Sequence, residues 1–330
     1  MLNIISDFIK GILPTKKKTT PSGWTSFNGV CCPHNGESAD TRGRGGLAAN
    51  PDGSVSYHCF NCNFKASYQP GRHLTFKFRK LLKWLGADDT DIKRLVIEAI
   101  RVRELVAPEE VKAEAEEEKI DFKVRDLPED AENLVALDYV HPALEYCVAR
   151  KIDIAKYAFY ATRQSQYNLH KRIIIPFVWQ GQTIGYTARA VEENVKPKYH
   201  SNYEPNFVFN INNQLPESKF VIVCEGPFDA MSIDGVAVLN NECNETQADI
   251  IESLGKEVIV VADRDRAGAK MINNAIEYGW TVSYPVWLET CKDVNEAVCK
   301  YGKLFVLKTI LDAKHSSKLK IELMKKKLYA

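Results

Sequence analysis

Two short stretches in the second half of the chain decide its fold: FVIVCEG at residues 220–226 and VIVVADRD at residues 258–265. In each, an apolar run of five residues ends directly on acidic side chains. Apolar runs of this length, bounded by polar residues, are typical of buried strands. Two further runs, at 236–239 and 281–286, alternate with helical patterns. This alternation predicts βαβ units and a mainly parallel sheet, which places the chain in the α/β class.

The acidic residues that follow these strands are the first candidate site. Glu225 and Asp229 come after the first strand, and Asp263 and Asp265 come after the second. Ligands bind beyond the carboxyl ends of parallel strands, so we expect these side chains to share one edge of the sheet. Carboxylates gathered in one place repel each other unless a cation neutralises them, and Mg²⁺ binds through few carboxylates plus substrate phosphates. The pattern therefore predicts a magnesium site suited to phosphoryl transfer.

A second candidate site lies near the N-terminus, where cysteines and a histidine have the spacing of metal ligands. Cys31 and His34 form a C-x2-H pair, and Cys59 and Cys62 form a C-x2-C pair. Four nitrogen and sulfur ligands predict a closed, tetrahedral, structural zinc. Cys32 is the alternative first ligand, but Cys31 is preferred because its spacing repeats that of the second pair. Buried free thiols beside an incidental histidine remain the competing interpretation.

The charge of the chain is balanced overall but not locally. Its 330 residues carry a formal net charge of +1, so the total charge does not by itself indicate nucleic acid or a membrane surface. Residues 14–80 contain ten basic and three acidic side chains, interleaved with aromatic residues. That combination suits a single nucleic-acid strand, although the rings could equally form the core of a small domain. Residues 104–121 are strongly acidic, which predicts an exposed linker.

The remaining patterns predict helices, a β-hairpin and the cellular location of the protein. We expect short helices at 1–13, on both sides of Gly86 within 76–103, and at 142–151, and a hairpin of 173–178 with 183–190. No apolar run approaches the length of a bilayer span, and the first residues lack a secretory signal. We therefore expect a cytoplasmic protein, in the host cytoplasm if a phage encodes it. Its nine cysteines then indicate metal binding rather than disulfides.

These motifs resemble those of a known family. Residues 219–300 resemble the Toprim fold of primases, topoisomerases and related nucleases, and YHCFNC at 57–62 looks like part of the zinc ribbon of bacterial and phage DNA primases. The order of segments is that of a DnaG-type primase. Overall length, KDVN at 292–295 and the basic tail look most like the stand-alone primases of T-even-type bacteriophages. Residues 81–140 match no family motif.

The resemblance implies a fold and a division of the chain. The fold would be α/β, with a small zinc ribbon followed by a two-part primase core that contains a Toprim parallel sheet. The implied domains are a DNA-binding zinc ribbon at 1–80, a helical and acidic linker at 81–124, the N-terminal half of an RNA polymerase core at 125–218, a Toprim domain at 219–302 and a helical basic tail at 303–330.

The resemblance also implies roles for the acidic residues. Glu225 would be the acidic residue of the metal site and a candidate general base. Asp263 and Asp265 would hold Mg²⁺, one ion or two, with Mn²⁺ as the alternative metal. Asp229 and Asp293 would be auxiliary carboxylates of the same cleft.

Basic residues of the preceding half would hold nucleotide phosphates and template. The implied residues are Arg172, in RIIIPF at 172–177, Arg189, in GYTAR at 185–189, and Lys198. For each of them a solvated charge on a sheet face is the alternative.

The implied activity is that of a nucleotidyltransferase, a DNA-directed RNA polymerase that makes short RNA primers on single-stranded DNA for phage DNA replication. Its partners would be template and ribonucleoside triphosphates, with no membrane. The 330 residues contain no P-loop motif, so a replicative helicase would act in trans. A Toprim nuclease and a zinc-containing DNA-binding repair protein remain the alternatives. A topoisomerase would need a further DNA-gate domain.

Overall fold

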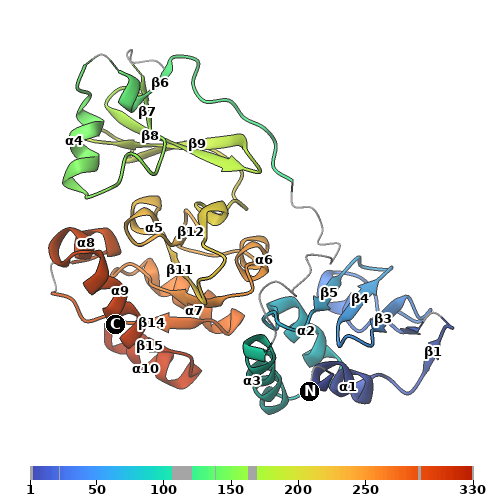
Figure 1. Ribbon diagram of the computed structural model, residues 1–330. Coiled ribbons are helices and arrows are strands. Elements are labelled where there is room, and N and C mark those ends of the chain that lie inside the picture. Colours follow the sequence, from blue (N-terminus) through green and yellow to red (C-terminus); the bar gives the residue numbers. More distant parts are fainter. Residues whose placement is uncertain are drawn as a thin grey trace. The chain divides into compact units, whose positions relative to one another are not determined.

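The computed structural model describes residues 3–21, 23–105, 121–137, 139–162, 169–288 and 291–328. The chain divides into two units, of residues 1–118 with 252–256 and of residues 119–251 with 257–330 (Figure 1). Among the described residues, no helix combines the length and the apolar character that a membrane crossing requires.

The first unit is built on an antiparallel sheet with the strand order β1-β2-β3-β4-β5. Its strands are β1 (Lys17–Thr19), β2 (Trp24–Phe27), β3 (Gly45–Ala49), β4 (Val55–Cys59) and β5 (Lys65–Tyr68). Along β4, buried Val55 and Tyr57 alternate with exposed Ser56. A strand with this period of two packs one face into a core and leaves the other to solvent.

Among the residues of the first unit that the structure describes, three helices pack into its core: α1 (Ile4–Ile12), α2 (Phe76–Trp84) and α3 (Asp89–Leu105). Ile5, Phe78 and Leu95 are buried in one cluster with Tyr57 of the sheet. The predicted helices on both sides of Gly86 are thus present and pack with the ribbon, so this unit continues past residue 80. Most of the predicted acidic linker, residues 106–120, lies outside the described residues.

The second unit begins with another antiparallel sheet, in the order β10-β9-β8-β7-β6. Its strands are β6 (Ala131–Asn133), β7 (Tyr160–Thr162), β8 (Arg172–Trp179), β9 (Gln182–Ala190) and β10 (Tyr199–Asn202). The predicted hairpin is β8 with β9, and its turn residues Gln180 and Gly181 have φ angles of 48° and 81°. Positive φ at both positions matches the twist of a two-residue hairpin. Helix α4 (Pro142–Ala149) ends just before Arg150.

The second sheet of this unit confirms the predicted parallel arrangement. The order is β12-β11-β13-β14-β15, with β12 (Val236–Ala237), β11 (Phe220–Cys224), β13 (Glu257–Val260) and β14 (Thr281–Ser283) parallel. Strand β15 (Lys314–His315) pairs antiparallel with β14. The helices are α5 (Pro227–Ile233), α6 (Glu245–Ser253), α7 (Gly268–Tyr278), α8 (Val294–Tyr301), α9 (Lys303–Asp312) and α10 (Lys318–Leu328). Figure 1 shows α5, α8 and α9 beside this sheet, and Ile222 and Ile259 are buried in one cluster with Val298 and Val306.

Candidate functional site

The acidic residues after β11 and β13 meet, as the strand pattern predicts. Val223 of β11 lies opposite Val260 of β13 in parallel register, so both strands end at the same edge. The main-chain N–H of Asp263 donates a hydrogen bond of 3.1 Å to Oε1 of Glu225. A Cβ on Gly268 would lie 2.2 Å from the carbonyl oxygen of Asp263 and 3.0 Å from Oε1 of Glu225. Only glycine therefore fits where α7 begins against this edge.

The other carboxylates reach the same edge from the starts of helices. Asp265 accepts hydrogen bonds from the main-chain N–H groups of Ala267 and Gly268, at 2.8 and 2.9 Å. Asp293 caps α8 by accepting from the N–H of Glu296 at 2.7 Å. Carboxylates favour this position because the first N–H groups of a helix lack partners within it.

Asp229, in the first turn of α5, is the most deeply buried member of the set. Its side chain is 7% exposed, and its Oδ1 accepts a hydrogen bond of 2.9 Å from the main-chain N–H of Asn295. The structure thus brings together all five acidic residues that the sequence singled out. We call Glu225, Asp229, Asp263, Asp265 and Asp293 the acidic cluster.

Burial and mutual repulsion raise the pKa values of this cluster. Burial, followed by the charges of Asp265 and Asp229, raises the pKa of Glu225 to about 7. Burial and the neighbouring carboxyls, Glu225 first, raise the pKa of Asp263 to about 8. The pKa of Asp229 lies well above its usual range because of burial and then of Asp293 and Asp263. A cation among these groups would remove the repulsion that raises their pKa values.

The donor set fits magnesium better than a metal that is fully enclosed by protein. Within the described residues, the cysteines are the only group of three or more ligating side chains whose ligand atoms all lie within 4.8 Å of one another. The acidic cluster is looser than that group. A looser set of oxygen donors suits Mg²⁺, which retains several waters and is completed by substrate phosphates.

Positive side chains lie within electrostatic reach of the acidic cluster. Burial lowers the pKa of Lys198, Arg189 and Arg150 lower it further, and Asp293 and Asp263 act in the opposite direction. The Arg189 guanidinium lies over the rings of Tyr199 and Phe228, at 4.9 and 5.5 Å.

The guanidinium of Arg150 packs on Phe228 of α5, as that of Arg189 does. It lies 5.0 Å from the ring of Tyr146 and 5.7 Å from that of Phe228. It also opposes the rise in the pKa of Asp229. Aromatic faces thus hold both arginine guanidinium groups near the acidic cluster.

Arg172 does not face this site, which corrects the prediction that it holds phosphates. Its side chain is fully buried, and it donates hydrogen bonds to the carbonyl oxygens of Pro197 at 2.6 Å and of Ala188 and Lys198 at 3.3 Å. A planar guanidinium with five N–H donors can satisfy several carbonyls at once. The structural role of Arg172 is therefore to fix the segment that carries Lys198.

The second candidate site is a cluster of four sulfur atoms in the first unit. The Sγ atoms of Cys31 and Cys62 lie 3.3 Å apart, those of Cys32 and Cys59 lie 3.5 Å apart, and all four lie within 4.8 Å of one another. Tetrahedral zinc with Zn–S bonds of about 2.3 Å separates its sulfurs by roughly 3.8 Å. The four cysteines fit a structural zinc ion.

His34 is not part of this cluster, so the predicted C-x2-H pair is wrong. Cys31 and Cys32 both point inward at the start of a 3-10 turn, Cys32–Asn35, which carries the exposed His34 away. The His34 ring instead stacks on Trp84, with centroids 4.7 Å apart and planes at 4°. The first knuckle therefore supplies two adjacent cysteines, and Cys32 takes the place predicted for His34.

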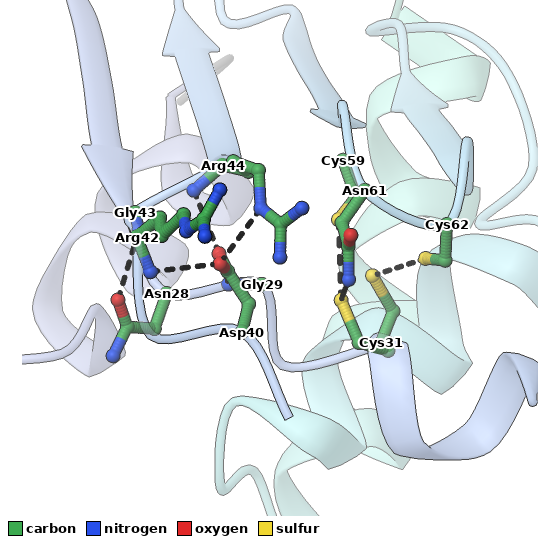
Figure 2. Close-up of polar contacts among 11 residues, drawn as sticks. Asn28, Gly29, Cys31, Asp40, Arg42, Gly43, Arg44, Cys59, Asn61 and Cys62 are labelled. Carbon is green, nitrogen blue, oxygen red and sulfur yellow. Dashed lines mark hydrogen bonds and ion pairs between the residues drawn. The ribbon is translucent and has the colours of Figure 1, made fainter. Parts of the chain in front are cut away.

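Polar groups around the sulfurs support this metal site. Nδ2 of Asn61 donates to Sγ of Cys32 at 3.3 Å (Figure 2). The Tyr57 hydroxyl lies 3.3 Å from Sγ of Cys31. Hydrogen bonds of this kind stabilise thiolate charge and orient metal ligands. A Cβ on Gly29 would lie 2.6 Å from Sγ of Cys59, so the backbone also approaches the cluster closely.

A buried carboxylate shapes the loop beside the sulfur cluster. Asp40 accepts hydrogen bonds from the N–H groups of Gly29, Arg42 and Arg44 at 2.8, 2.9 and 2.6 Å, and from Nε of Arg44 at 3.0 Å (Figure 2). Although burial opposes the charge, these bonds hold the pKa of Asp40 well below its usual range. The loop of Arg42 and Arg44 is therefore a fixed turn tied to the residue, Gly29, that packs on the sulfurs.

Two residues of the site were not singled out from the sequence. Arg150 follows a short helix, and a basic residue at a helix end ordinarily indicates only a favourable dipole interaction. Asn295 was part of the KDVN motif, but an amide carries no charge that would mark it as a ligand. Their pairing spans 145 positions in the sequence, which only the folded chain reveals.

Comparison with known proteins agrees with this geometry. Residues 222–298 match the family described as Toprim-like. A DNA primase of Aquifex aeolicus (strain VF5) is 26% identical over 152 residues, which are 40% of this chain and 30% of that protein. The chain therefore spans less than a third of this curated relative.

Solved structures of primases are also similar, with TM-scores below 0.5. The zinc-binding and RNA polymerase domains of the Aquifex aeolicus primase are 19% identical, with 94% of this chain and 83% of that chain covered and a TM-score of 0.45. A DnaG primase catalytic domain bound to single-stranded DNA is 18% identical, with 58% and 78% covered and a TM-score of 0.48. The resemblance to Toprim proteins and DNA primases is confirmed: the chain contains a Toprim-like domain at residues 222–298 and is related in sequence to a DNA primase.

Proposed function

We propose that this protein is a DNA primase that synthesises short RNA primers on single-stranded DNA by Mg²⁺-dependent nucleotidyl transfer. The observation that carries the proposal is the acidic cluster at the carboxyl edge of the Toprim-like sheet, with Lys198, Arg189 and Arg150 within electrostatic reach. The relation to a curated DNA primase supports it. The resemblance to stand-alone phage primases extends the proposal to phage DNA replication, with a helicase acting in trans.

In this proposal the acidic cluster is the catalytic centre. Glu225, Asp263 and Asp265 would hold one or two Mg²⁺ ions, and Asp229 and Asp293 would support them. When bound, Mg²⁺ shields the triphosphate and favours attack by the 3′-hydroxyl. Glu225 is also the candidate general base for the proton of that hydroxyl.

The basic residues would position the nucleotide. Lys198, Arg189 and Arg150 carry the positive charge that phosphates require, and the aromatic rings under the two arginines limit their motion. Holding the triphosphate in line for displacement supplies much of the acceleration in such reactions. Arg172 contributes indirectly by fixing the segment of Lys198.

The first unit would select the template. Its four cysteines would hold a structural zinc, and the basic and aromatic residues of 14–80 suit a single strand. In this proposal, the first unit reads the start site on the template.

One assay tests the proposal. Single-stranded template, the four ribonucleotides and Mg²⁺ are incubated with the chain, and labelled products are separated on a gel. Labelled oligoribonucleotides are expected. Cleaved template would instead indicate a Toprim nuclease, and DNA binding without either product, with a replicative helicase added, would indicate a binding protein.

A further inference from the structure

A single buried amide connects the acidic cluster to the arginine at the end of α4. Asn295 lies in the first turn of α8 and is 1% exposed. Its Oδ1 accepts a hydrogen bond of 2.8 Å from Nη1 of Arg150, and its Nδ2 donates to the main-chain oxygen of Arg150 at 2.9 Å. The side chain of one residue thus binds both the guanidinium and the backbone of another.

The other contacts of Asn295 extend to α5. Its Nδ2 also donates to Oγ of Ser232 at 2.7 Å, and that hydroxyl donates in turn to the carbonyl oxygen of Phe228 at 2.8 Å. Its main-chain N–H donates to Asp229. Asn295 therefore links α8, α5 and the end of α4, and every polar group of its side chain has a partner.

The chemistry of these partners requires an amide. The oxygen end faces a cation, and the nitrogen end faces two oxygen acceptors, so the two ends cannot be exchanged. An aspartate would place a carboxylate against the carbonyl oxygen of Arg150. An apolar residue would leave the carbonyl of Arg150 and the hydroxyl of Ser232 without this donor inside the protein.

We propose that Asn295 is a positioning residue that holds the Arg150 guanidinium beside the acidic cluster, where it meets the phosphates of the incoming nucleotide. The inference rests on the proposed nucleotidyl transfer and adds to it a residue that touches neither metal nor nucleotide. Arg150 is only half-buried and is the C-cap residue that directly follows α4. Without the amide, its long side chain keeps the two aromatic contacts but has more rotamers, and fixing one of them when the nucleotide binds costs conformational entropy.

The test compares Asn295→Ala, Arg150→Ala and the double variant in the full chain. Binding of ATP with Mg²⁺ is measured by calorimetry, and KM and kcat are measured in primer synthesis. Each single variant is expected to weaken ATP binding and raise KM about tenfold, with kcat changed less than about threefold. The double variant should be no weaker than Arg150→Ala, because the effect of Asn295 passes through Arg150.

Two further variants make the result unambiguous. Asn212→Ala removes an exposed amide that bonds to the carbonyl of Val178, and it should leave binding and KM unchanged. If Asn295→Ala does not fold, Asn295→Asp preserves the shape and should weaken ATP binding at least fivefold, because its charge offsets that of Arg150.

The outcomes separate this inference from the proposed function. A wild-type chain that makes no primers but binds Mg²⁺–ATP, more tightly than Asn295→Ala does, would overturn primase activity and support the positioning role. Wild-type binding by the Asn295 variants, additive losses in the double variant, or no binding of Mg²⁺–ATP by the wild type would overturn the inference.

Discussion

Replacing Glu225 by glutamine should make the magnesium-free protein more stable, and the gain should grow with pH. In the folded chain, burial and the charges of Asp265 and Asp229 raise the pKa of Glu225 from 4.5 to about 7. A carboxyl with a raised folded pKa binds its proton more tightly when folded. Its contribution to stability is therefore lost as pH rises from about 4.5 through 7.

The size of this gain in stability follows from the shift in the pKa of Glu225. A rise from 4.5 to about 7 corresponds to about 3 kcal/mol of unfavourable interaction once the carboxyl is ionised. Glutamine resembles the protonated acid and can still accept the hydrogen bond from Asp263. Glu225→Gln should therefore raise the free energy of unfolding by about 3 kcal/mol at pH 8 and by less than about 1 kcal/mol at pH 5.

Urea unfolding of both chains at pH 5 and pH 8, without added Mg²⁺, measures this difference. Glu277→Gln makes the same chemical change at an exposed position of α7 and should alter stability by less than about 0.5 kcal/mol. Added Mg²⁺ should stabilise the wild type more than Glu225→Gln at pH 8, because binding to the folded state adds to its stability. Equal stability of wild type and Glu225→Gln at both pH values would refute the inference that burial and neighbouring carboxylates destabilise ionised Glu225.

Three other predictions concern the acidic cluster, the four cysteines and the loop that Asp40 holds. Asp263→Ala should abolish primer synthesis, assayed on gels, while the zinc content measured by mass spectrometry stays at that of the wild type; retained synthesis would contradict the placement of the catalytic centre. Cys32→Ser should lose zinc and His34→Ala should retain it, and the reverse pattern would restore the histidine as a ligand. Asp40→Asn leaves one acceptor oxygen for four donors, so it should destabilise the first unit by about 1.5–3 kcal/mol in thermal unfolding; an unchanged transition would mean that the loop does not depend on the carboxylate.

The buried amide of Asn295 and the buried guanidinium of Arg172 have similar structural roles. Each satisfies carbonyl groups of a segment that carries a basic residue, Arg150 in one case and Lys198 in the other. A nucleotide site assembled from separate segments needs such connections, because a displacement of about 1 Å in a catalytic group can cost roughly a hundredfold in rate.

The sequence by itself determined the parallel sheet and the acidic cluster. Apolar runs ending on Glu225 and Asp263 could be interpreted directly, because strand direction fixes which ends of neighbouring strands coincide. It also indicated a metal site, because closely spaced pairs of cysteines are typical of metal ligands.

Tertiary structure alone decided which side chains serve the two sites. The direction of one tight turn selects Cys32 over His34, and spacing in the sequence does not specify that direction. Arg172 has a structural role because its side chain is buried. Arg150 lies near the acidic cluster, where it is bound by Asn295, a residue 145 positions away in the sequence. Charge and spacing are local properties of a sequence, whereas burial and partners depend on segments that meet only in the folded chain.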